Sequence, residues 1–179
     1  MSADSRIISA ILEIDNKPLH IVNIYAPSGS KNSERDDFFN KDLIYYLRNN
    51  LDNSVIGGDF NCITSPRDSS SDSTHVCKVL KDNFKGLKME DAWSLCHTNV
   101  EYTYIRTDYG SRLDRLYLKD LSSNIKSICV KHINFSDHSC VQLEVKLSNI
   151  KIVHYYWKLN VLLLDEADVK YAFNKNGTG

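Results

Sequence analysis

The stretch "SVIGGDFNC", residues 54–62, decides the fold, because an apolar run ends in two glycines followed by an acid. Its first residues fit a buried strand, and the glycine pair lets another backbone approach closely. Side chains alternate along a strand, so Asp59 and Asn61 share one face at its end. A carboxylate beside an amide can hold a water molecule or a metal ion, although an Asx-rich turn closing a strand is the commoner meaning of such a pair.

The composition is that of one globular domain. The chain has 179 residues, of which 42% are hydrophobic and 25% charged, enough to build a substantial core. The formal net charge is −1 and the isoelectric point is about 6.6, which excludes a protein that grips nucleic acid mainly by bulk positive charge. Any contact with nucleic acid must therefore come from local groups.

The cysteines and the N-terminus indicate an intracellular protein. The five cysteines are odd in number and widely spaced, and no CxxC pair occurs, which argues against both a zinc site and a disulfide framework. The first residues lack the apolar region of a signal peptide, and no later run approaches transmembrane length. A reducing compartment is the expected location.

Outward from the opening stretch, strand patterns dominate. The segments "RIISAILEI" (6–14) and "LHIVNIYAP" (19–27) flank turn residues and predict a hairpin, whose second arm is apolar on both faces and so should be an inner strand. Helices are expected over 33–50 and 75–84. Further strands are expected at 102–107, 112–119, 125–135 and 140–147. Because strands outnumber helices and few are separated by helices, the fold class is α+β, with a mixed or antiparallel two-layer sheet core and helices outside.

Polar side chains recur at the predicted strand ends. Each has an ordinary structural explanation: a half-buried tyrosine, a surface ion pair of Asp114 with a flanking arginine, a capped turn, or a histidine bound to a carbonyl group. Together they supply the groups that phosphoryl chemistry uses. They are Asn23 and Tyr25; Asp59 and Asn61; Thr103 and Asp114; and Ser136, Asp137 and His138.

Cleavage of a phosphodiester needs an aligned water, a cation or donor on the non-bridging oxygens, and help for the departing oxygen. An Asp beside an Asn can orient and polarise the water. A His held by an Asp can donate to the phosphate as its imidazolium, and a Tyr hydroxyl can donate to the same group. Mg²⁺ takes oxygen ligands and usually keeps several waters, so one or two carboxylates suffice to bind it.

Four motifs occur in a fixed order: "HIVNIYAP", "GGDFN", "YTYIRTDYGSRLDRLY" and "SDHSCVQLEV". In this order the sequence resembles the endonuclease/exonuclease/phosphatase superfamily, and most of all the apurinic-endonuclease-like domain of non-LTR (LINE-type) retrotransposons. "DAWS" (91–94) adds to the resemblance, as does "YYWKLNVLLLDE" (155–166), which is similar to the segment joining such endonucleases to a reverse transcriptase. The resemblance covers about residues 6–166.

The resemblance implies an α/β/β/α architecture, a two-layer β-sandwich of mixed sheets flanked by helices. It places an endonuclease/exonuclease/phosphatase domain at 1–150 and a linker toward a reverse transcriptase at 151–179. It also implies roles for individual residues. Asp59 would polarise the attacking water beside Asn61. His138, oriented by Asp114, would contact the scissile phosphate, and Tyr25 would contact the same phosphate. Asp137 would lie at the metal edge, Thr103 and Ser136 would line the site, and Arg112 and Arg106 would contact the DNA backbone.

One departure from the family bears on activity. Family members begin with a strand bearing an Asn and then a strand–helix unit bearing a Glu, the principal metal ligand, whereas this chain enters directly at the hairpin of residues 6–27. Glu13 lies in the wrong element to replace that Glu. We therefore expect a fold missing its leading strands, Mg²⁺ or Mn²⁺ bound weakly if at all, and little or no nicking.

The predicted function is target-site nicking of DNA with Mg²⁺, impaired in this chain. The alternatives are a non-catalytic remnant of a mobile element and another superfamily phosphoesterase, acting on inositol phosphates or phosphomonoesters. DNA is the expected partner, with no membrane and no stable protein partner. A functional copy would act in the nucleus.

Overall fold

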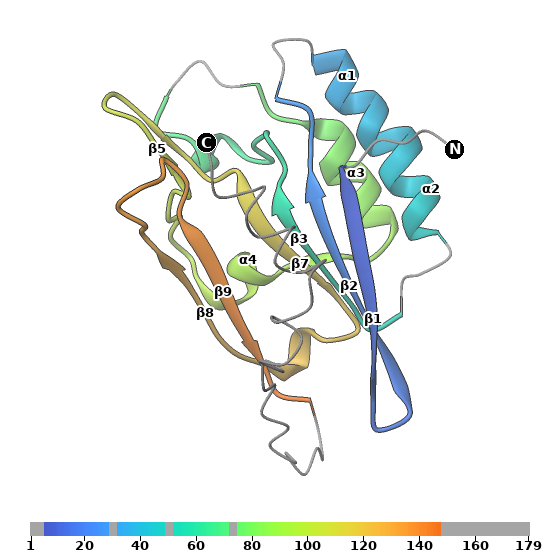
Figure 1. The fold of residues 1–179 in the computed structure, drawn as a ribbon. Helices are drawn as coiled ribbons and strands as arrows, with labels where there is room; N and C mark the ends of the chain where they lie inside the picture. Colours follow the sequence, from blue (N-terminus) through green and yellow to red (C-terminus); the bar gives the residue numbers. More distant parts are fainter. Residues whose placement is uncertain (1–5, 29–31, 49–51, 72–74, 148–179) are drawn as a thin grey trace, which may run out of the picture.

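The computed structural model describes residues 6–28, 32–48, 52–71 and 75–147, so the expected linker at 151–179 lies outside the described residues. A five-stranded mixed sheet forms its centre (Figure 1). In spatial order its strands are β1 (Ile7–Ile14), β2 (Lys17–Tyr25), β3 (Ser54–Asp59), β7 (Asp114–Lys119) and β4 (Glu90–Asp91). Within this sheet of the described residues, β2 and β3 pair in parallel and the other neighbours pair antiparallel. The predicted hairpin and the inner position of its second strand are confirmed.

Two short ladders complete the strand content. A hairpin joins β5 (Tyr104–Ile105) to β6 (Gly110–Ser111), and a longer antiparallel pair joins β8 (Ile125–Lys131) to β9 (Cys140–Val145). The strand expected over 112–119 begins only at Asp114, because the amides of Leu113 and Asp114 both donate to the hydroxyl of Thr103. Mixed sheets with few helices give the expected α+β class.

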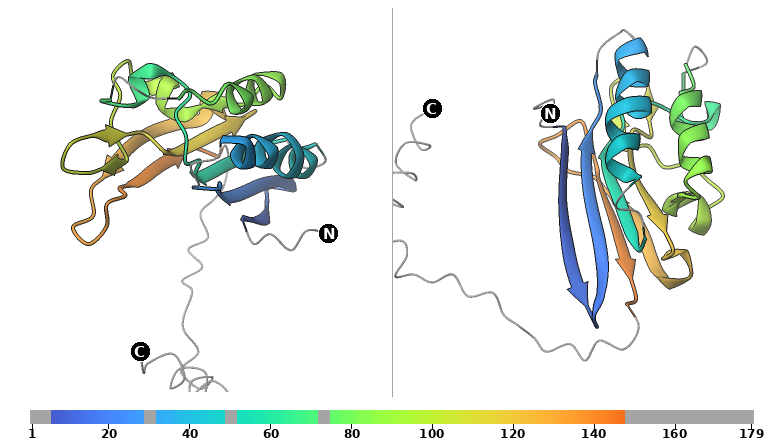
Figure 2. Two further views of the ribbon diagram at one scale, coloured as in Figure 1. Left: turned by 90° about the horizontal axis from the view of Figure 1, so that it is seen from above. Right: turned by 90° about the vertical axis from the view of Figure 1, so that its right-hand side faces the viewer.

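The first helix and the helix at 78–86 lie on one side of the five-stranded sheet (Figure 2), whereas the short helix at 92–96 packs with the β8–β9 pair. A first helix runs through α1 (Asn32–Asp37), a π-helical segment η1 (Phe38–Leu43) and α2 (Ile44–Leu47), so the helix expected over 33–50 contains a π-turn that the sequence did not reveal. The helix expected over 75–84 is α3 (Lys78–Gly86), and α4 (Ala92–Cys96) follows β4. Short 3₁₀ turns are η2 (Pro66–Asp68) and η3 (Ser122–Asn124). No helix of the described ranges is long and apolar enough to span a bilayer.

Two apolar clusters lie on opposite faces of the central sheet. Ile56 and Tyr117 are paired residues on β3 and β7, and both belong to the cluster beneath the helices. Their neighbours Val55 and Leu116 point to the other face, where they join a cluster with residues of β8 and β9. The β8–β9 pair therefore lies on the face opposite the first helix and α3, and the polar ends of β3 and β7 are left at one edge.

Gly58 should be intolerant of any side chain. Its φ angle is +133°, and an added Cβ would lie 2.0 Å from the carbonyl oxygen of Ile24 on β2. We expect Gly58→Ala to lower the free energy of unfolding by about 1–3 kcal/mol, measured by urea denaturation. Gly86→Ala is the control, because a Cβ there meets nothing within 4 Å and helical alanine is favoured over glycine. Equal stabilities of the two variants would contradict the steric argument.

Candidate active site

Three side chains of the predicted site lie in one row across the sheet. Tyr25 on β2 pairs with Asp59 on β3, and Asp59 pairs with Asp114 on β7. Paired residues of neighbouring strands share a face, so the phenol and the two carboxylates emerge side by side at the same sheet edge. The backbone continues the ladder one residue further, where the Ala26 amide donates to the Asp59 carbonyl oxygen at 2.8 Å.

The turn after β3 fixes Asp59 and Asn61 against each other. Asn61 has a positive φ of +47°, which asparagine tolerates, and its amide donates to Asp59 Oδ1 at 2.8 Å. The side-chain nitrogen of Asn61 donates to the Ala26 carbonyl oxygen at 2.8 Å. The guanidinium of Arg35, from α1, donates to the Asn61 carbonyl oxygen at 2.7 Å. Arg35 is thus a positioning residue that the sequence analysis missed.

Burial is the main reason that the pKa of Asp59 lies above its ordinary value. The hydrogen bond from the Asn61 amide lowers that pKa, the charge of Asp114 raises it and the charge of His138 lowers it, and the net shift is upward. The carboxylate of Asp59 is therefore a stronger proton acceptor than a solvent-exposed aspartate, which suits a group that orients and polarises a water molecule.

His138 and Asp114 form the predicted pair. His138 Nδ1 lies 2.8 Å from Asp114 Oδ2, and the imidazole ring lies 4.9 Å from the ring of Tyr104, centroid to centroid. Burial alone would lower the pKa of His138, but the hydrogen bond and charge of Asp114, with the charges of Asp59 and Asp137, raise it above its ordinary value. The protonated imidazolium is favoured, as a donor to a phosphate oxygen requires.

Thr103 supports the site from beneath. Its side chain is 1% exposed, and its hydroxyl accepts from the amides of Leu113 at 3.0 Å and Asp114 at 2.9 Å. Its carbonyl oxygen accepts from the Ser139 amide at 2.6 Å, which ties the His138 segment to the same point. Thr103 was expected to line the site toward the substrate; the structure instead places it where it positions Asp114.

The remaining predicted residues divide into exposed and buried. Ser136 and Asp137 are exposed, and Ser136 Oγ accepts from the His138 amide at 3.0 Å. Arg106 is exposed in the β5–β6 turn, 5.6 Å from the Tyr104 ring. Arg112 is only 5% exposed, and its guanidinium is held by buried carboxylates, so the expectation that it contacts the DNA backbone is wrong.

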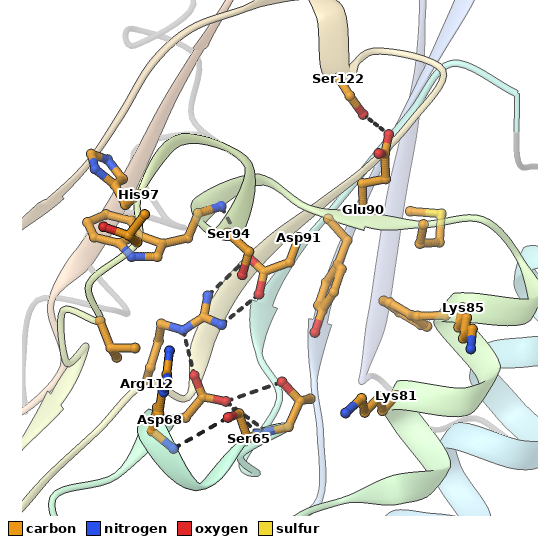
Figure 3. Close-up of a pocket in the computed structure, with 18 of the residues that line it drawn as sticks. Ser65, Asp68, Lys81, Lys85, Glu90, Asp91, Ser94, His97, Arg112 and Ser122 are labelled. Atoms are coloured by element: carbon orange, nitrogen blue, oxygen red, sulfur yellow. Dashed lines mark hydrogen bonds and ion pairs between the residues drawn. The ribbon is translucent and has the colours of Figure 1, made fainter.

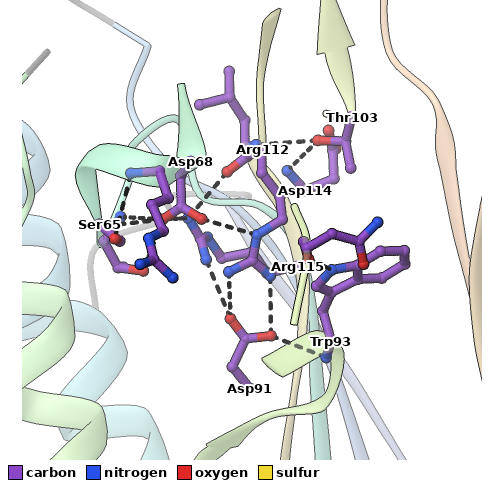
Figure 4. Close-up of polar contacts among 12 residues, drawn as sticks. Ser65, Asp68, Asp91, Trp93, Thr103, Arg112, Asp114 and Arg115 are labelled. Atoms are coloured by element: carbon purple, nitrogen blue, oxygen red, sulfur yellow. Dashed lines mark hydrogen bonds and ion pairs between the residues drawn. The ribbon is translucent and has the colours of Figure 1, made fainter. Parts of the chain in front are cut away.

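Arg112 belongs to a buried ion network of two arginines and two aspartates (Figure 4). Asp68 on η2 binds Arg112 Nε at 3.0 Å and Arg115 Nη2 at 2.7 Å, and Asp91 binds the same two arginines at 2.6 and 3.2 Å. Arg115 is 1% exposed and Asp68 2%. The network joins η2, the start of α4 and the approach to β7, so it holds together the loops behind the Asp59–Asp114 edge.

The oxygen donors at the edge are of the kind that Mg²⁺ prefers, namely the carboxylates of Asp59 and Asp137 and the amide oxygen of Asn61. Within the described residues no group of three or more His, Cys, Asp or Glu side chains is placed to hold a metal ion. A cation at this edge would therefore take few ligands from the described residues and would keep most of its ligands as water.

No family model matches the chain. Its structure is similar to that of the 3′ phosphatase NExo from Neisseria, bound to a product DNA hairpin, with a TM-score of 0.66 and 19% identity over 79% of this chain and 65% of that one. An AP endonuclease from Archaeoglobus fulgidus gives a TM-score of 0.63 and 22% identity over 79% of this chain and 65% of that one. The chain has the endonuclease/exonuclease/phosphatase superfamily fold.

Two further similarities are to mobile elements. Within the superfamily, the endonuclease domain of TRAS1, a telomere-specific non-LTR retrotransposon, gives a TM-score of 0.60 and 18% identity over 80% of this chain and 65% of that one. In sequence, 93% of the chain is 30% identical to the transposon TX1 uncharacterized 149 kDa protein of Xenopus laevis. The chain spans 14% of that protein's length.

The pair of His138 and Asp114 can be tested by titration. Asp114→Asn removes the charge that most favours the imidazolium, so we expect the pKa of His138 to fall in the variant. NMR titration of the His138 ring resonances measures the change. Asp108→Asn, which removes an exposed carboxylate from the β5–β6 turn, is the control and should leave the titration curve of His138 in place. Unchanged curves in both variants would contradict the pairing.

The same pair has a consequence for stability. Because the folded-state pKa of His138 is raised, its contribution is fully present below the unfolded-state pKa and is lost as the pH rises through the folded-state pKa. In Asp114→Asn, the free energy of unfolding should therefore change less with pH between the unfolded-state and the folded-state pKa of His138.

Proposed function

We propose that this chain is a retrotransposon-type endonuclease domain that hydrolyses DNA phosphodiester bonds in a Mg²⁺-dependent reaction. The observation that carries the proposal is the meeting of Asp59, Asp114 and His138 at one sheet edge, with His138 Nδ1 2.8 Å from Asp114 Oδ2. Its support is the superfamily fold and the similarity of the sequence to a transposon-encoded protein.

Each residue has a task in this proposal. Asp59, held by the Asn61 amide, orients the attacking water and accepts its proton. His138, held as imidazolium by Asp114, donates a hydrogen bond to a non-bridging phosphate oxygen, and Tyr25 on the neighbouring strand donates to the same phosphate. Mg²⁺ or Mn²⁺, when bound by Asp137 and Asp59, would offset the negative charge of the phosphate.

We expect nicking by this chain to be slow. Asp137 is exposed, and Asp59 is engaged by the Asn61 amide and also needed at the water, so the two hold a cation loosely. A misplacement of about 1 Å among reacting groups can cost on the order of a hundredfold in rate.

The proposed architecture is a two-layer sandwich. The β8–β9 pair covers the β3 and β7 part of the sheet face, whereas Ile8, Leu12 and Ile21 on β1 and β2 remain 66%, 44% and 37% exposed. These side chains continue the same face, since Leu12 pairs with Leu19, which belongs to the β8–β9 cluster. Further strands beside β8–β9 would cover them.

Conversion of supercoiled plasmid to open circles tests the function. A single nick relaxes a whole plasmid, so even slow cleavage accumulates to a measurable product. Open circles that form with Mg²⁺ and not with a chelator would support the proposal. Intact plasmid would indicate a non-catalytic remnant, and release of phosphate from an inositol phosphate without nicking would indicate a different phosphoesterase.

A further inference from the structure

A cavity of about 950 Å³ lies between η2, α3 and α4, along the β4 edge of the sheet (Figure 3). None of the residues assigned to the proposed cleavage reaction lines it. It begins at Ser65 and Arg67, in the loop that follows the Asn61 turn, and it reaches Ser122 beyond the far end of β7. The cavity is thus an elongated groove that leads away from the catalytic edge.

The groove carries positive charge that the described part of the chain does not neutralise. Lys81 and Lys85 lie one turn apart on α3, Lys88 follows just after the helix, and all three are exposed and line the groove, as does Arg67. No ion pair joins any of these four cations to a carboxylate of the described residues. Like charges one turn apart destabilise an isolated helix, so an anionic partner would relieve their repulsion.

The acids of the groove offset only part of its positive charge. Asp68 and Asp91 are bound by the two buried arginines, which leaves the exposed Glu90 and Asp120 against the four cations. The lining therefore keeps an excess of positive charge, although the protein as a whole has a net charge of −1. A row of cations suits a ligand with repeated negative charges better than it suits one phosphate group.

The far wall of the groove is aromatic. Trp93 and His97 line it with their rings 4.2 Å apart, and Phe84 and Tyr117 lie beneath the lysine side. Trp93, Phe84 and Tyr117 are 5%, 3% and 6% exposed, so they form the apolar floor of the groove, and only the His97 ring among them is partly exposed. The exposed cations above this floor are the groups that the phosphates of a strand would meet. A concave groove of this size admits one strand more readily than it admits a convex duplex.

We propose that this groove binds single-stranded nucleic acid through its backbone. The proposal is independent of the cleavage reaction, because the groove and the catalytic edge share no residue. It also accounts for how a chain with an isoelectric point of about 6.6 could hold nucleic acid, since the positive charge is concentrated on one face of α3.

Fluorescence anisotropy with a labelled oligothymidylate, in chelator so that no cleavage occurs, tests the proposal. The double variant Lys81→Gln/Lys85→Gln removes two groove charges. Its matched control is Lys17→Gln/Lys146→Gln, which removes two exposed charges from β2 and from the residue after β9. We expect the groove variant to bind about tenfold more weakly, and its plot of log affinity against log salt to be shallower by about 1.4, from roughly 0.7 for each lost phosphate contact. The control should bind like the parent.

Several outcomes would overturn the proposal: a parent that does not bind the strand, equal losses in both double variants, or a duplex bound as tightly and with the same dependence on Lys81 and Lys85. Equal melting temperatures of the two double variants establish that both are folded. Binding is measured without divalent cation, so an absence of plasmid nicking does not affect the binding result. A protein that nicks plasmid normally but does not bind the oligothymidylate would refute the groove proposal and leave the proposed function standing.

Discussion

Asp68→Ala is expected to lower the free energy of unfolding by about 3–5 kcal/mol, the usual effect of removing one partner of a buried ion pair. The Asp68 carboxylate is 2% exposed and binds Arg112 at 3.0 Å and Arg115 at 2.7 Å. It also accepts from the amides of Thr64 at 3.0 Å and Ser65 at 2.8 Å. Alanine would leave the fully buried Arg115 with Asp91 alone and would release the η2 turn.

The measurement is urea denaturation of the parent and the variant. Asp37→Ala is the control, because it breaks an exposed pair with Lys41, 2.9 Å long, in which the side chains are 63% and 70% exposed. Exposed pairs contribute about 0–1 kcal/mol, so the control should stay close to the parent. A small effect at Asp68 comparable to that at Asp37 would show that water reaches the network.

The pH dependence of Asp68 follows from its lowered pKa. Burial raises the pKa of this carboxyl, but the charges of Arg115 and Arg112 and the hydrogen bonds it accepts outweigh burial and leave the pKa below its ordinary value. Its contribution is present above the unfolded-state pKa and is lost as the pH falls through the folded-state pKa. The parent should therefore lose more stability on acidification than Asp68→Ala does.

His138→Ala should reduce the rate of plasmid nicking by about 10²–10⁴, the usual contribution of a positioned proton donor. The substitution removes the imidazolium that Asp114 holds at 2.8 Å and leaves the phosphate without its charged donor. Because the ring is half-buried at the sheet edge, alanine there should cost little stability. The loss should therefore appear in the rate and not in the amount of folded protein.

The assay follows open-circle formation over long incubations with Mg²⁺. His132→Ala is the matched control: His132 lies on the same loop, its side chain is bound to the Ser139 hydroxyl at 2.8 Å, and it has no part in the proposed reaction. Nicking that persists at the parent rate in His138→Ala, or that disappears equally in His132→Ala, would contradict the assignment.

The sequence predicted the strands correctly where the local pattern of apolar residues matches the burial of those residues in the folded protein. The apolar pattern identified β2, β3, β8 and β9, since each has one face or both against a core, and it identified β1 through its hairpin with β2 although most of β1 is exposed. The strand ends identified Asp59, Asp114 and His138, because polar groups that close apolar strands must lie at a sheet edge. The pairing of His138 with Asp114 was implied by the resemblance to the superfamily, because the local sequence indicates that a partly buried acid needs a partner but does not say which one.

What the sequence did not reveal depends on contacts between distant segments. Arg112 and Arg115 are three apart and flank Asp114, which suggested a surface ion pair; their true partners, Asp68 and Asp91, are 20 to 50 positions away, and no periodicity links them. Arg35 holds the Asn61 turn from a separate helix for the same reason. The π-turn in the first helix is likewise invisible in the pattern of its apolar residues.

The row that joins Tyr25, Asp59 and Asp114 makes catalysis depend on three strands at once. A slip of one residue in either pairing would turn one of these side chains to the opposite face, although the backbone could still form a sheet. A chain that has folded in the wrong alignment would therefore be unable to cut, whatever its remaining stability. On the proposed function, cleavage would therefore report the alignment of the sheet as well as its stability.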